Sequence, residues 1–492
     1  MTASDPKQGA RGQILPLFCF SLVVLLAIGA LLIDGAGTLV LRRKLQNAGD
    51  AAALAGANTL QVSGGLHVCS TVSNAPPGAP RQDIIDAVMA SLAVNMPSIT
   101  SSQVSITCPD GQENQAVRVD LNVRSTSYLS ATIGLSAANV STTSVALNGQ
   151  VTGSTYSVVV LDPTNSGWPN GRRGCPAFLI SGGPTLVFDG SVYVDSACTA
   201  ANGGAMAANG NSATVTLGTG ALIKLVGGYA PGPLTITPSP TTGASVLDDP
   251  LIDLESVPYG STTCTGAGQS QPACVRSASR LVLNNTTMVL QPGVYIGGIQ
   301  LRNSSIALLR PGIYVFDGGG LDIGAQASFC SISATSTATD CSSFATDCPD
   351  ATCGVLLYNR GTASGSNAMG QVTVGAGATL KLRAYDDRAN ANQYYEYRNL
   401  LIWQDKSPAA SSSYAQPIVQ LSGGGSVEIS GTVYAPQGKV LMGGNSGGSG
   451  GGNVNLLLQF ICFDLEMSGN SAFHFFYSDT DFAKPRDYGL IQ

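Results

Sequence analysis

The spacing of hydrophobic positions changes twice along this chain of 492 residues. The first pattern is an apolar run over residues 12–33, with no charge between Arg11 and Asp34. About 20 apolar residues, rising about 1.5 Å each, cross a hydrocarbon core of about 30 Å as one helix. A stripe at spacings of three and four then continues to Ala55, which predicts one helix from about residue 13 to 60. Its membrane-spanning part is expected to include Ile14, Leu15, Leu25, Gly29 and Ile33.

A second, mixed pattern follows the expected helix. Residues 63–80 are rich in Gly, Pro and Ser, as linkers are. Residues 82–96 place apolar side chains on one helical face, and residues 104–108 and 116–123 alternate like strands. We therefore expect an anchor region over residues 1–62 and a small α+β domain over residues 63–150.

From about residue 155 short alternating segments are separated by Gly, Asn and Asp. A Pro-Gly-Val-Tyr segment at Pro292 recurs as Pro-Gly-Ile-Tyr at Pro311, 19 residues later. A repeat of about 20 residues with Pro-Gly and Gly-Gly turns is typical of a β-solenoid. The chain is therefore predicted to be mainly β, with residues 151–492 forming a right-handed parallel β-helix. Loops are expected to interrupt it at 228–275, 330–353 and 384–413.

Composition narrows the function classes. Only 11% of the residues are charged, the chain has 60 glycines, and its net charge is −6. Low charge with many glycines and β-branched residues favours an extracytoplasmic β protein over a cytosolic enzyme. Nucleic acid is not expected as a partner, because phosphate binding needs clustered Lys and Arg. With His67 and His474 as its only histidines, the chain is predicted not to be an enzyme.

The 12 cysteines indicate an oxidising compartment. Cys19 lies inside the apolar run, and Cys462 is left over. Disulfides are favoured over zinc for the rest, since no Cys-x2-Cys pair or neighbouring histidine is present, and the connectivity stays open. Basic residues on both sides of the apolar run leave its orientation undecided, so the cysteines place the body outside the membrane. The ten candidates are Cys69, Cys108, Cys175, Cys198, Cys264, Cys274, Cys330, Cys341, Cys348 and Cys353.

The residues that flank the apolar run resemble a known family. Gly12-Gln13 precedes the run, and Asp34-Gly35-Ala36-Gly37 follows it, before Arg-Arg-Lys-Leu-Gln-Asn-Ala at 42–48 and Asp-Ala-Ala-Ala-Leu-Ala at 50–55. This string resembles the N-terminal region of TadG-like proteins of the Tad (Flp) pilus-assembly system. The resemblance implies a membrane-anchored protein of the pilus or cell envelope. Substrates of prepilin peptidases carry Glu five residues after the cleaved Gly; Leu17 stands there, so we expect the helix to remain as an anchor.

A candidate metal site follows the apolar residues 158–161. Asp162, Thr164 and Ser166 resemble the metal-ion-dependent adhesion motif of von Willebrand A domains, which occur in other TadG-like proteins. In that motif carboxylate and hydroxyl oxygens hold Mg²⁺. The alternative is a turn at Asp162-Pro163, which the lack of alternating helices favours. No other cofactor is expected.

Two further groups are candidates for binding. The acidic residues Asp248, Asp249, Asp253 and Glu255 are expected to bind Ca²⁺, to act on glycan, or to form a solvated loop, which we favour. Aromatic residues gather within residues 385–414, either to bind sugars or partner proteins or to pack as a core. They are Tyr385, Tyr394, Tyr395, Tyr397, Trp403 and Tyr414.

These observations predict a single-pass, membrane-anchored, extracytoplasmic structural or adhesive protein associated with Tad (Flp) pilus assembly or the cell surface. Its expected partners are the membrane, pilins or other Tad components, and cell-wall or surface glycan. The alternative is a surface β-helix that binds or cleaves polysaccharide.

Overall fold

The computed structural model separates the chain into two compact units, Met1–Gln150 with Asp487–Gln492, and Val151–Arg486. The sequence prediction placed residues 487–492 in the second domain, whereas they belong to the first unit. The structure describes residues 14–60, 69–70, 79–109, 115–127, 131, 134, 136–150, 156–163, 175–210, 212–266, 274–349, 351–362, 368–386, 394–406, 419–423, 426–444, 454–470, 472–478, 481–483 and 486–491.

The first unit is organised around one long helix. α1 runs over Ile14–Asn58, close to the predicted 13–60. Its second half is rich in Ala, the best helix former, and buries Leu45, Ala48 and Ala52 in the core of the unit. α2, Gln82–Asn95, buries the predicted face against the same core.

A four-stranded sheet completes this unit, in the order β1-β2-β3-β32. β2 pairs antiparallel with β3 along the whole length of β2, from Ala116 opposite Leu147 to Arg124 opposite Asn139. Alternate residues of β2 enter the core beside α1, because successive side chains of a strand point to opposite faces. The strands are β1 (Val104–Thr107), β2 (Ala116–Arg124), β3 (Asn139–Gln150) and β32 (Arg486–Leu490).

The last strand explains the difference in domain boundaries. β32 extends the sheet beside β3, and the N–H of Ile491 donates to the carbonyl of Val145 at 2.9 Å. Backbone pairing holds this segment, so its five residues need no strong hydrophobic alternation to form a strand. The chain therefore leaves the first unit after Gln150 and returns to it at its C-terminus.

The second unit is one large parallel sheet; within the described residues it contains 28 strands. Its first strands are β4 (Tyr156–Val160), β5 (Phe178–Gly182), β6 (Thr185–Phe188), β7 (Ser191–Val194), β8 (Met206–Asn209), β9 (Ala213–Leu217), β10 (Ile223–Leu225), β11 (Tyr229–Ala230), β12 (Leu234–Thr237) and β13 (Thr241–Thr242). Then follow β14 (Thr262–Thr263), β15 (Cys274–Ser277), β16 (Leu281–Asn284), β17 (Thr287–Leu290), β18 (Gly293–Ile296), β19 (Ile299–Arg302), β20 (Ile306–Leu309), β21 (Gly312–Asp317), β22 (Leu321–Ile323) and β23 (Ser328–Ser331). The last are β24 (Val355–Arg360), β25 (Val372–Val374), β26 (Thr379–Leu382), β27 (Leu400–Gln404), β28 (Val419–Gly423), β29 (Val427–Gly444), β30 (Val454–Gly469) and β31 (Ala472–Phe475). Short helices are α3 (Phe344–Asp347) and the 3₁₀ turns η1 (Ser101–Gln103, first unit), η3 (Ala200–Asn202), η4 (Ala351–Cys353) and η6 (Tyr395–Tyr397).

Most strands of this unit pair with the strand three further along. β15 pairs with β18, β18 with β21, β21 with β24 and β24 with β27, and we call this series the first column. β16 and β17 begin two further series of the same kind. Each turn of the chain thus adds one strand to each of three parallel stacks.

The stacking order differs from the chain order. The first column continues from β27 through β29 and β30 to β4, β7, β10 and β13. The first strand of the unit, β4, therefore meets its second-to-last strand, β30, in the middle of the stack, where Phe460 pairs with Val158. The two outer ends are built from β13 and β14, which are consecutive strands.

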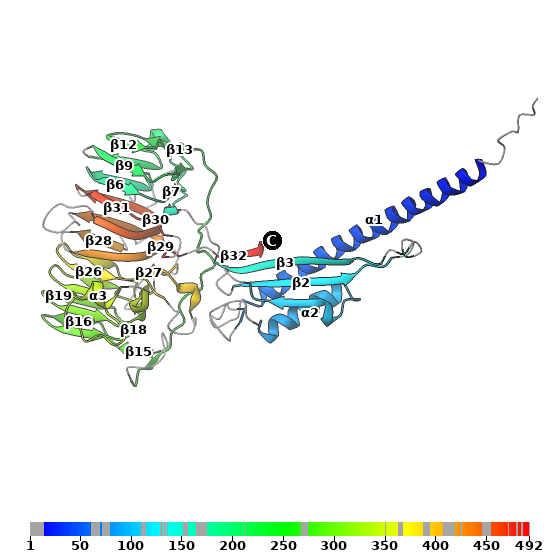
Figure 1. Cartoon of the computed structure of the whole chain (residues 1–492). Coiled ribbons are helices and arrows are strands. Elements are labelled where there is room, and N and C mark those ends of the chain that lie inside the picture. The colour runs from blue at the N-terminus through cyan, green and yellow to red at the C-terminus, as the bar shows by residue number, and fades with distance from the viewer. Residues whose placement is uncertain are drawn as a thin grey trace, which may run out of the picture. The chain divides into compact units, whose positions relative to one another are not determined.

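A long connection, residues 243–261, joins these outer ends. Eleven parallel pairings separate β13 from β14, or roughly 50 Å at about 4.8 Å each. Nineteen residues reach about 60 Å when extended, so the connection runs nearly straight along the stack. Figure 1 shows it passing in green from β13 to the region of β15.

Successive side chains along the strands of the first column alternate between two hydrophobic clusters. Val158 and Val160 of β4 belong to the larger cluster, whereas Val159 between them belongs to a second one. Register aligns the second set into a continuous outer row across nine strands. The outer row is Val275, Val294, Val315, Tyr358, Trp403, Tyr434, Ile461, Val159 and Tyr193.

The connection covers this outer row. Leu251, Leu254 and Val257 are buried in the same cluster as Trp403 and Tyr434. An outward-facing apolar row would otherwise be exposed to water, so the connection acts as its third layer. The predicted loops are thus partly regular: 228–275 contains β11 to β14 and the start of β15, and 384–413 contains β27.

Candidate functional site

A pocket in the second unit forms where strands of the first column end. Register places Cys462 opposite Val160, and Val160 opposite Val194. The residues that follow these strands therefore lie side by side. The N–H of Leu161 donates to the carbonyl of Cys462, and the N–H of Asp195 to the carbonyl of Val160, both at 2.8 Å.

The pocket has a volume of about 460 Å³ and combines these strand ends with the connection. Residues far apart in sequence meet there: they follow β4, β7 and β27, belong to β29 and β30, or lie within residues 246–252. Its apolar wall includes Leu161, Val246, Ile252 and Phe463. Its charged groups are Asp195, Asp248, Asp249 and Lys406.

Asp249 joins the connection to the stack. Its Oδ2 accepts a hydrogen bond from the hydroxyl of Tyr434 at 2.6 Å, and its Oδ1 accepts one from the N–H of Leu251 at 2.9 Å. Burial raises the pKa of Asp249, while the Tyr434 hydroxyl, the Leu251 N–H and the Lys406 charge oppose that change.

Lys406 holds the same connection from the other side. Its ammonium donates to the carbonyls of Leu251 at 2.8 Å and Leu254 at 3.0 Å, and also to that of Ile252. Burial lowers the pKa of Lys406, and nearby carboxylates, first that of Asp249, counter this effect. The ammonium is thus bonded to backbone rather than open to a ligand.

Asp195 supplies a second carboxylate to the pocket. Its Oδ1 accepts a hydrogen bond from the N–H of Leu247 at 3.2 Å. Burial raises the pKa of Asp195, and the charges of Asp248 and Asp162 raise it further. Together with the exposed Asp248, this side of the pocket favours ligands that donate hydrogen bonds or carry positive charge.

The predicted metal site is only partly described. Asp162 is fully buried, and its backbone N–H donates to the carbonyl of Phe463 at 3.1 Å. Thr164 and Ser166 lie outside the described residues, so Mg²⁺ binding there stays a prediction. Among the residues that the structure describes, no group of three or more His, Cys, Asp and Glu side chains is arranged to hold a metal ion.

The structure separates the predicted acidic group. Asp249 turns toward Tyr434, while Asp248, Asp253 and Glu255 are exposed on the connection. The sequence suggested no link between this group and Asp195, because the two segments meet only through the stacking order.

The aromatic cluster is mostly a packing feature. Tyr385, Tyr397 and Trp403 are buried in the cluster of the outer row, and Tyr394 is half-buried against it. The side chain of Tyr395 and all of Tyr414 lie outside the described residues. The described members therefore do not form an exposed sugar-binding surface.

The described histidine pairs with a carboxylate. His474 Nε2 lies 2.8 Å from Asp189 Oδ1, and its ring lies 4.0 Å from that of Phe476. His67 is outside the described residues. The pair connects β31 to the residue after β6, at the junction between late and early strands.

All ten candidate cysteines form disulfides in the structure. The pairs are Cys69–Cys108, Cys175–Cys198, Cys264–Cys274, Cys330–Cys341 and Cys348–Cys353. Cys19 is free and exposed on α1, and Cys462 is free and buried.

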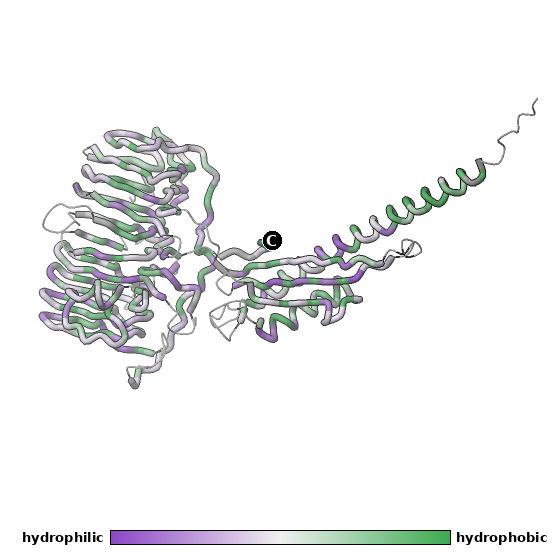
Figure 2. Tube along the Cα trace, in the orientation of Figure 1, coloured by the Kyte–Doolittle hydropathy of each residue, from purple (hydrophilic) through white to green (hydrophobic). Residues whose placement is uncertain are grey.

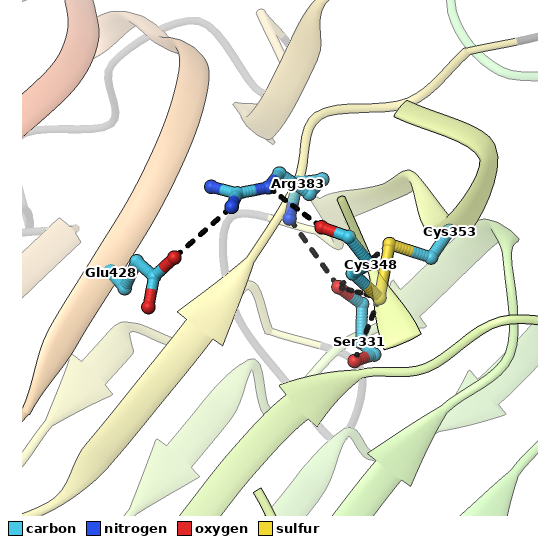
Figure 3. Close-up of polar contacts among 5 residues, drawn as sticks. All are labelled: Ser331, Cys348, Cys353, Arg383 and Glu428. Carbon is cyan, nitrogen blue, oxygen red and sulfur yellow. Dashed lines mark hydrogen bonds and ion pairs between the residues drawn. A yellow bond between two sulfur atoms is a disulfide. The ribbon is translucent and has the colours of Figure 1, made fainter. Parts of the chain in front are cut away.

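One disulfide belongs to a polar network, which Figure 3 shows. Arg383 pairs with Glu428 at 3.0 Å and donates to the carbonyl of Cys348 at 3.4 Å. Its guanidinium also lies over the ring of Phe344, 4.7 Å from the centroid. Because Cys348 and Cys353 are fully buried, this network fixes the segment between β23 and β24 rather than offering a reactive thiol.

The predicted membrane-spanning residues lie on the exposed first half of α1. Leu15, Leu25 and Ile33 are more than half exposed, Gly29 is half-buried, and the side chain of Ile14 is outside the described set. Figure 2 shows this half as an apolar stretch. Among the described residues, one helical segment, Leu17–Asn58, is long and apolar enough to cross a membrane, with a mean hydropathy of 2.6 in its most apolar window.

Comparison with known proteins finds a family that this helix resembles. Residues 12–59 match the family described as "Putative Flp pilus-assembly TadE/G-like". A search of curated proteins and a search of solved structures find no match to the chain. The match covers α1 and stops where the helix ends, so it carries the anchor and not the second unit. The N-terminal region of the protein is therefore similar to TadE/G-like proteins of Flp pilus assembly, and this similarity covers residues 12–59 alone.

Proposed function

We propose that the protein is a single-pass, membrane-anchored structural or adhesive component of Tad (Flp) pilus assembly or of the cell surface, with both units on the extracytoplasmic side. One observation carries this proposal: α1 combines the family match, an exposed apolar half and a second half that is the core of a folded unit. Such a helix ties the folded unit rigidly to the bilayer.

The second unit would then be the part of the protein that offers a surface for adhesion or scaffolding. We infer that it is a right-handed parallel β-helix, on the support of parallel pairing between every third strand in three stacks. Adhesive or scaffolding surfaces suit such a fold, since its rigid stack offers a long face on which side chains recur at regular spacing.

The compartment is tested by counting reactive cysteines. Whole cells are denatured in a maleimide polymer reagent without reductant, and the mass shift of the protein is read on a gel. An extracytoplasmic body keeps its ten paired cysteines oxidised, so only Cys19 and Cys462 react. Reaction of all 12 cysteines would place the body in the reducing cytosol. A parallel sample with reductant controls for reagent access.

The pilus role is tested by photocrosslinking in native membranes. A photoreactive residue replaces Gly37, which faces open space on α1, or Val94, which is exposed on α2. Crosslinks from Gly37 to pilins or other Tad components, absent from the Val94 control, are the expected result. Recovery of no Tad component from either position would contradict the role.

A second candidate function is binding or cleavage of polysaccharide. The pocket beside Asp195 and Asp248 supports it, since carboxylates accept hydrogen bonds from sugar hydroxyls and Phe463 adds an apolar wall. Calorimetry with cell-wall glycan fragments tests it. Asp248→Asn should weaken binding, whereas Glu255→Gln, on the same connection but outside the pocket, should not. If the heat of glycan binding is the same in both variants as in the parent protein, this pocket is not the binding site. An assay for new reducing ends then distinguishes cleavage of the glycan from binding alone.

A further inference from the structure

The exposed surface of α1 changes from apolar to basic within one turn. Its last two large apolar side chains in contact with solvent are Leu39, 64% exposed, and Val40, 53% exposed. Figure 2 shows this change from green to purple along α1. Three consecutive residues, all exposed, carry the positive charge, and they spread over more than half of the helix circumference because successive residues are about 100° apart. They are Arg42, Arg43 and Lys44.

The basic residues follow α1 at about one bilayer thickness from its start. From Leu15 to Val40 the helix rises about 38 Å, and a bilayer with its headgroups is about 40–45 Å thick. Side chains of a helix lean toward its N-terminus, which here is the direction of the apolar run. The charged groups of these residues therefore extend from the helix back toward the headgroup layer.

The first unit adds a fourth basic residue at the same level. β2 runs beside α1: a Cβ at Gly49 would lie 3.5 Å from Leu121 Cδ1, and past the end of β2 Ser127 donates its hydroxyl to Asp34 Oδ2 at 3.3 Å. The helix rises about 22 Å between these two contacts, and the extended chain about 20 Å, so the two segments advance together. Arg124 lies midway between the contacts and is exposed, hence level with the start of the basic residues of α1.

These four residues, Arg42, Arg43, Lys44 and Arg124, form what we call the basic belt. The sequence has no Asp or Glu in residues 35–49 or in residues 121–150. Within the part of the chain that the structure describes, no belt residue forms an ion pair, whereas Arg118 of β2 pairs with Asp120 at 2.9 Å. The belt therefore carries positive charge without a counter-charge, directly beside an apolar surface.

We propose that the basic belt binds the headgroups of anionic phospholipid in the leaflet from which α1 emerges. This contact rests on the membrane anchoring proposed above. The partner is the lipid of the bilayer that α1 crosses, because a lipid whose chains lie against Leu39 and Val40 brings its headgroup to the belt. Anionic lipid then gathers around α1 and holds the helix at a fixed depth. The attraction is electrostatic, so it weakens as salt is added.

Lipid-selective quenching tests the contact in the full-length protein. A single dye is attached through Leu39→Cys or Leu25→Cys in a Cys19→Ser background, and Cys462, which is buried, is left unchanged. The protein is reconstituted at low salt in vesicles of phosphatidylcholine with a fixed fraction of phosphatidylglycerol. One lipid or the other carries a spin label on its acyl chain, near the headgroup or at the chain end. The ratio of quenching by labelled phosphatidylglycerol to quenching by labelled phosphatidylcholine measures the enrichment of anionic lipid at the dye.

The dye at position 39 should give a ratio several-fold above one with the shallow labels. Neutralising the triplet by Arg42→Gln, Arg43→Gln and Lys44→Gln should bring the ratio close to one, whereas Arg42→Lys with Arg43→Lys keeps the charge and should keep the ratio. Arg124→Gln should lower it. Arg118→Gln, on the same strand but outside the belt, is the matched control and should leave it unchanged.

A ratio near one in the parent protein, or one that the triple glutamine variant retains, would overturn the binding of anionic lipid by the belt. Quenching of the dye at position 25 by chain-end labels would show in either case that the anchor stands. Absence of quenching at both positions would overturn the anchor, and the lipid contact with it.

Discussion

The hydroxyl of Tyr434 lies 2.6 Å from Asp249 Oδ2, and the two residues are 185 positions apart in the chain. Tyr434 belongs to the outer row, and Asp249 to the connection that covers it. This one contact joins the middle of the stack to the segment that links its ends.

Removing this contact should loosen the connection. Tyr434→Phe deletes the hydroxyl while keeping the ring, so it leaves Oδ2 of the partly buried Asp249 without the donor that Tyr434 supplies. We expect a loss of about 1–3 kcal/mol in the free energy of unfolding, as for a hydrogen bond to a charged group. Chemical denaturation followed by Trp403 fluorescence measures it. Tyr229→Phe, which removes a longer bond of 3.4 Å to Leu234, is the control and should change stability by less than about 1 kcal/mol.

The raised pKa of Asp249 predicts a pH dependence. The folded protein retains this proton to a higher pH than the unfolded chain does, because burial penalises the carboxylate. The stabilising contribution is complete below the unfolded pKa of about 3.9 and is lost as the pH rises through the folded value. Asp249→Asn should therefore flatten the fall in unfolding free energy as the pH rises above about 4. An unchanged slope in this variant, matching that of Asp253→Asn, would contradict the assignment.

Two glycines of α1 should respond differently to the same substitution. A Cβ at Gly56 would lie 2.7 Å from Val88 Cγ2 and 3.1 Å from Val117 Cγ1, whereas one at Gly37 meets nothing within 4 Å. Gly56→Val should destabilise the first unit by about 1–3 kcal/mol through overpacking. Gly37→Val should stay within about 0.5 kcal/mol of the parent. Thermal unfolding in detergent compares them, and equal effects would show that α2 does not pack closely there.

The C-terminal strand should protect the first unit. Deleting residues 486–492 removes β32 from the edge of β3 and leaves the β3 backbone without its outer partner. Amide hydrogen exchange should increase in β3, notably near Val145, with little change in β21 or β24 of the second unit. Equal protection of β3 in both proteins would mean that β32 pairs too weakly to matter.

The elements that the sequence predicts best are those whose bounds and buried faces follow from the spacing of neighbouring hydrophobic residues. The apolar run and the Ala stripe set α1 to within two residues at each end, because its one proline, Pro16, lies in the first turn, where a helix tolerates it. The apolar face of α2 and the alternation in β2 are equally clear from the sequence.

The repeat at Pro292 and Pro311 predicted stacked strands but not their register. Aligning the repeats places Tyr295 opposite Tyr314, whereas Tyr295 pairs with Phe316. A shift of two residues keeps the same side chains inside, so both registers satisfy the alternation and the hydrophobic pattern cannot choose between them. The two tyrosine rings still stack, with their centroids 6.1 Å apart.

The pocket could not be predicted because it depends on the stacking order. Asp195 and Lys406 line one pocket only because β30 pairs with β4, and Asp249 joins them because the connection returns along the outer row. The backbone bonds that set this order are the same for any pair of parallel strands. The one local sign is the spacing of Leu251, Leu254 and Val257, which marks a buried edge in a segment otherwise rich in turn residues.

The meeting of β30 with β4 also decides how the second unit would carry tension. A pull applied through the backbone at its first and last strands loads only the central rungs, where Phe460 pairs with Val158 and Phe473 with Leu186. The strands on either side of this junction, out to β13 and β14, carry no part of the applied force. Under tension the second unit is therefore expected to unfold first at the β30–β4 junction, while the strands on both sides of that junction remain folded.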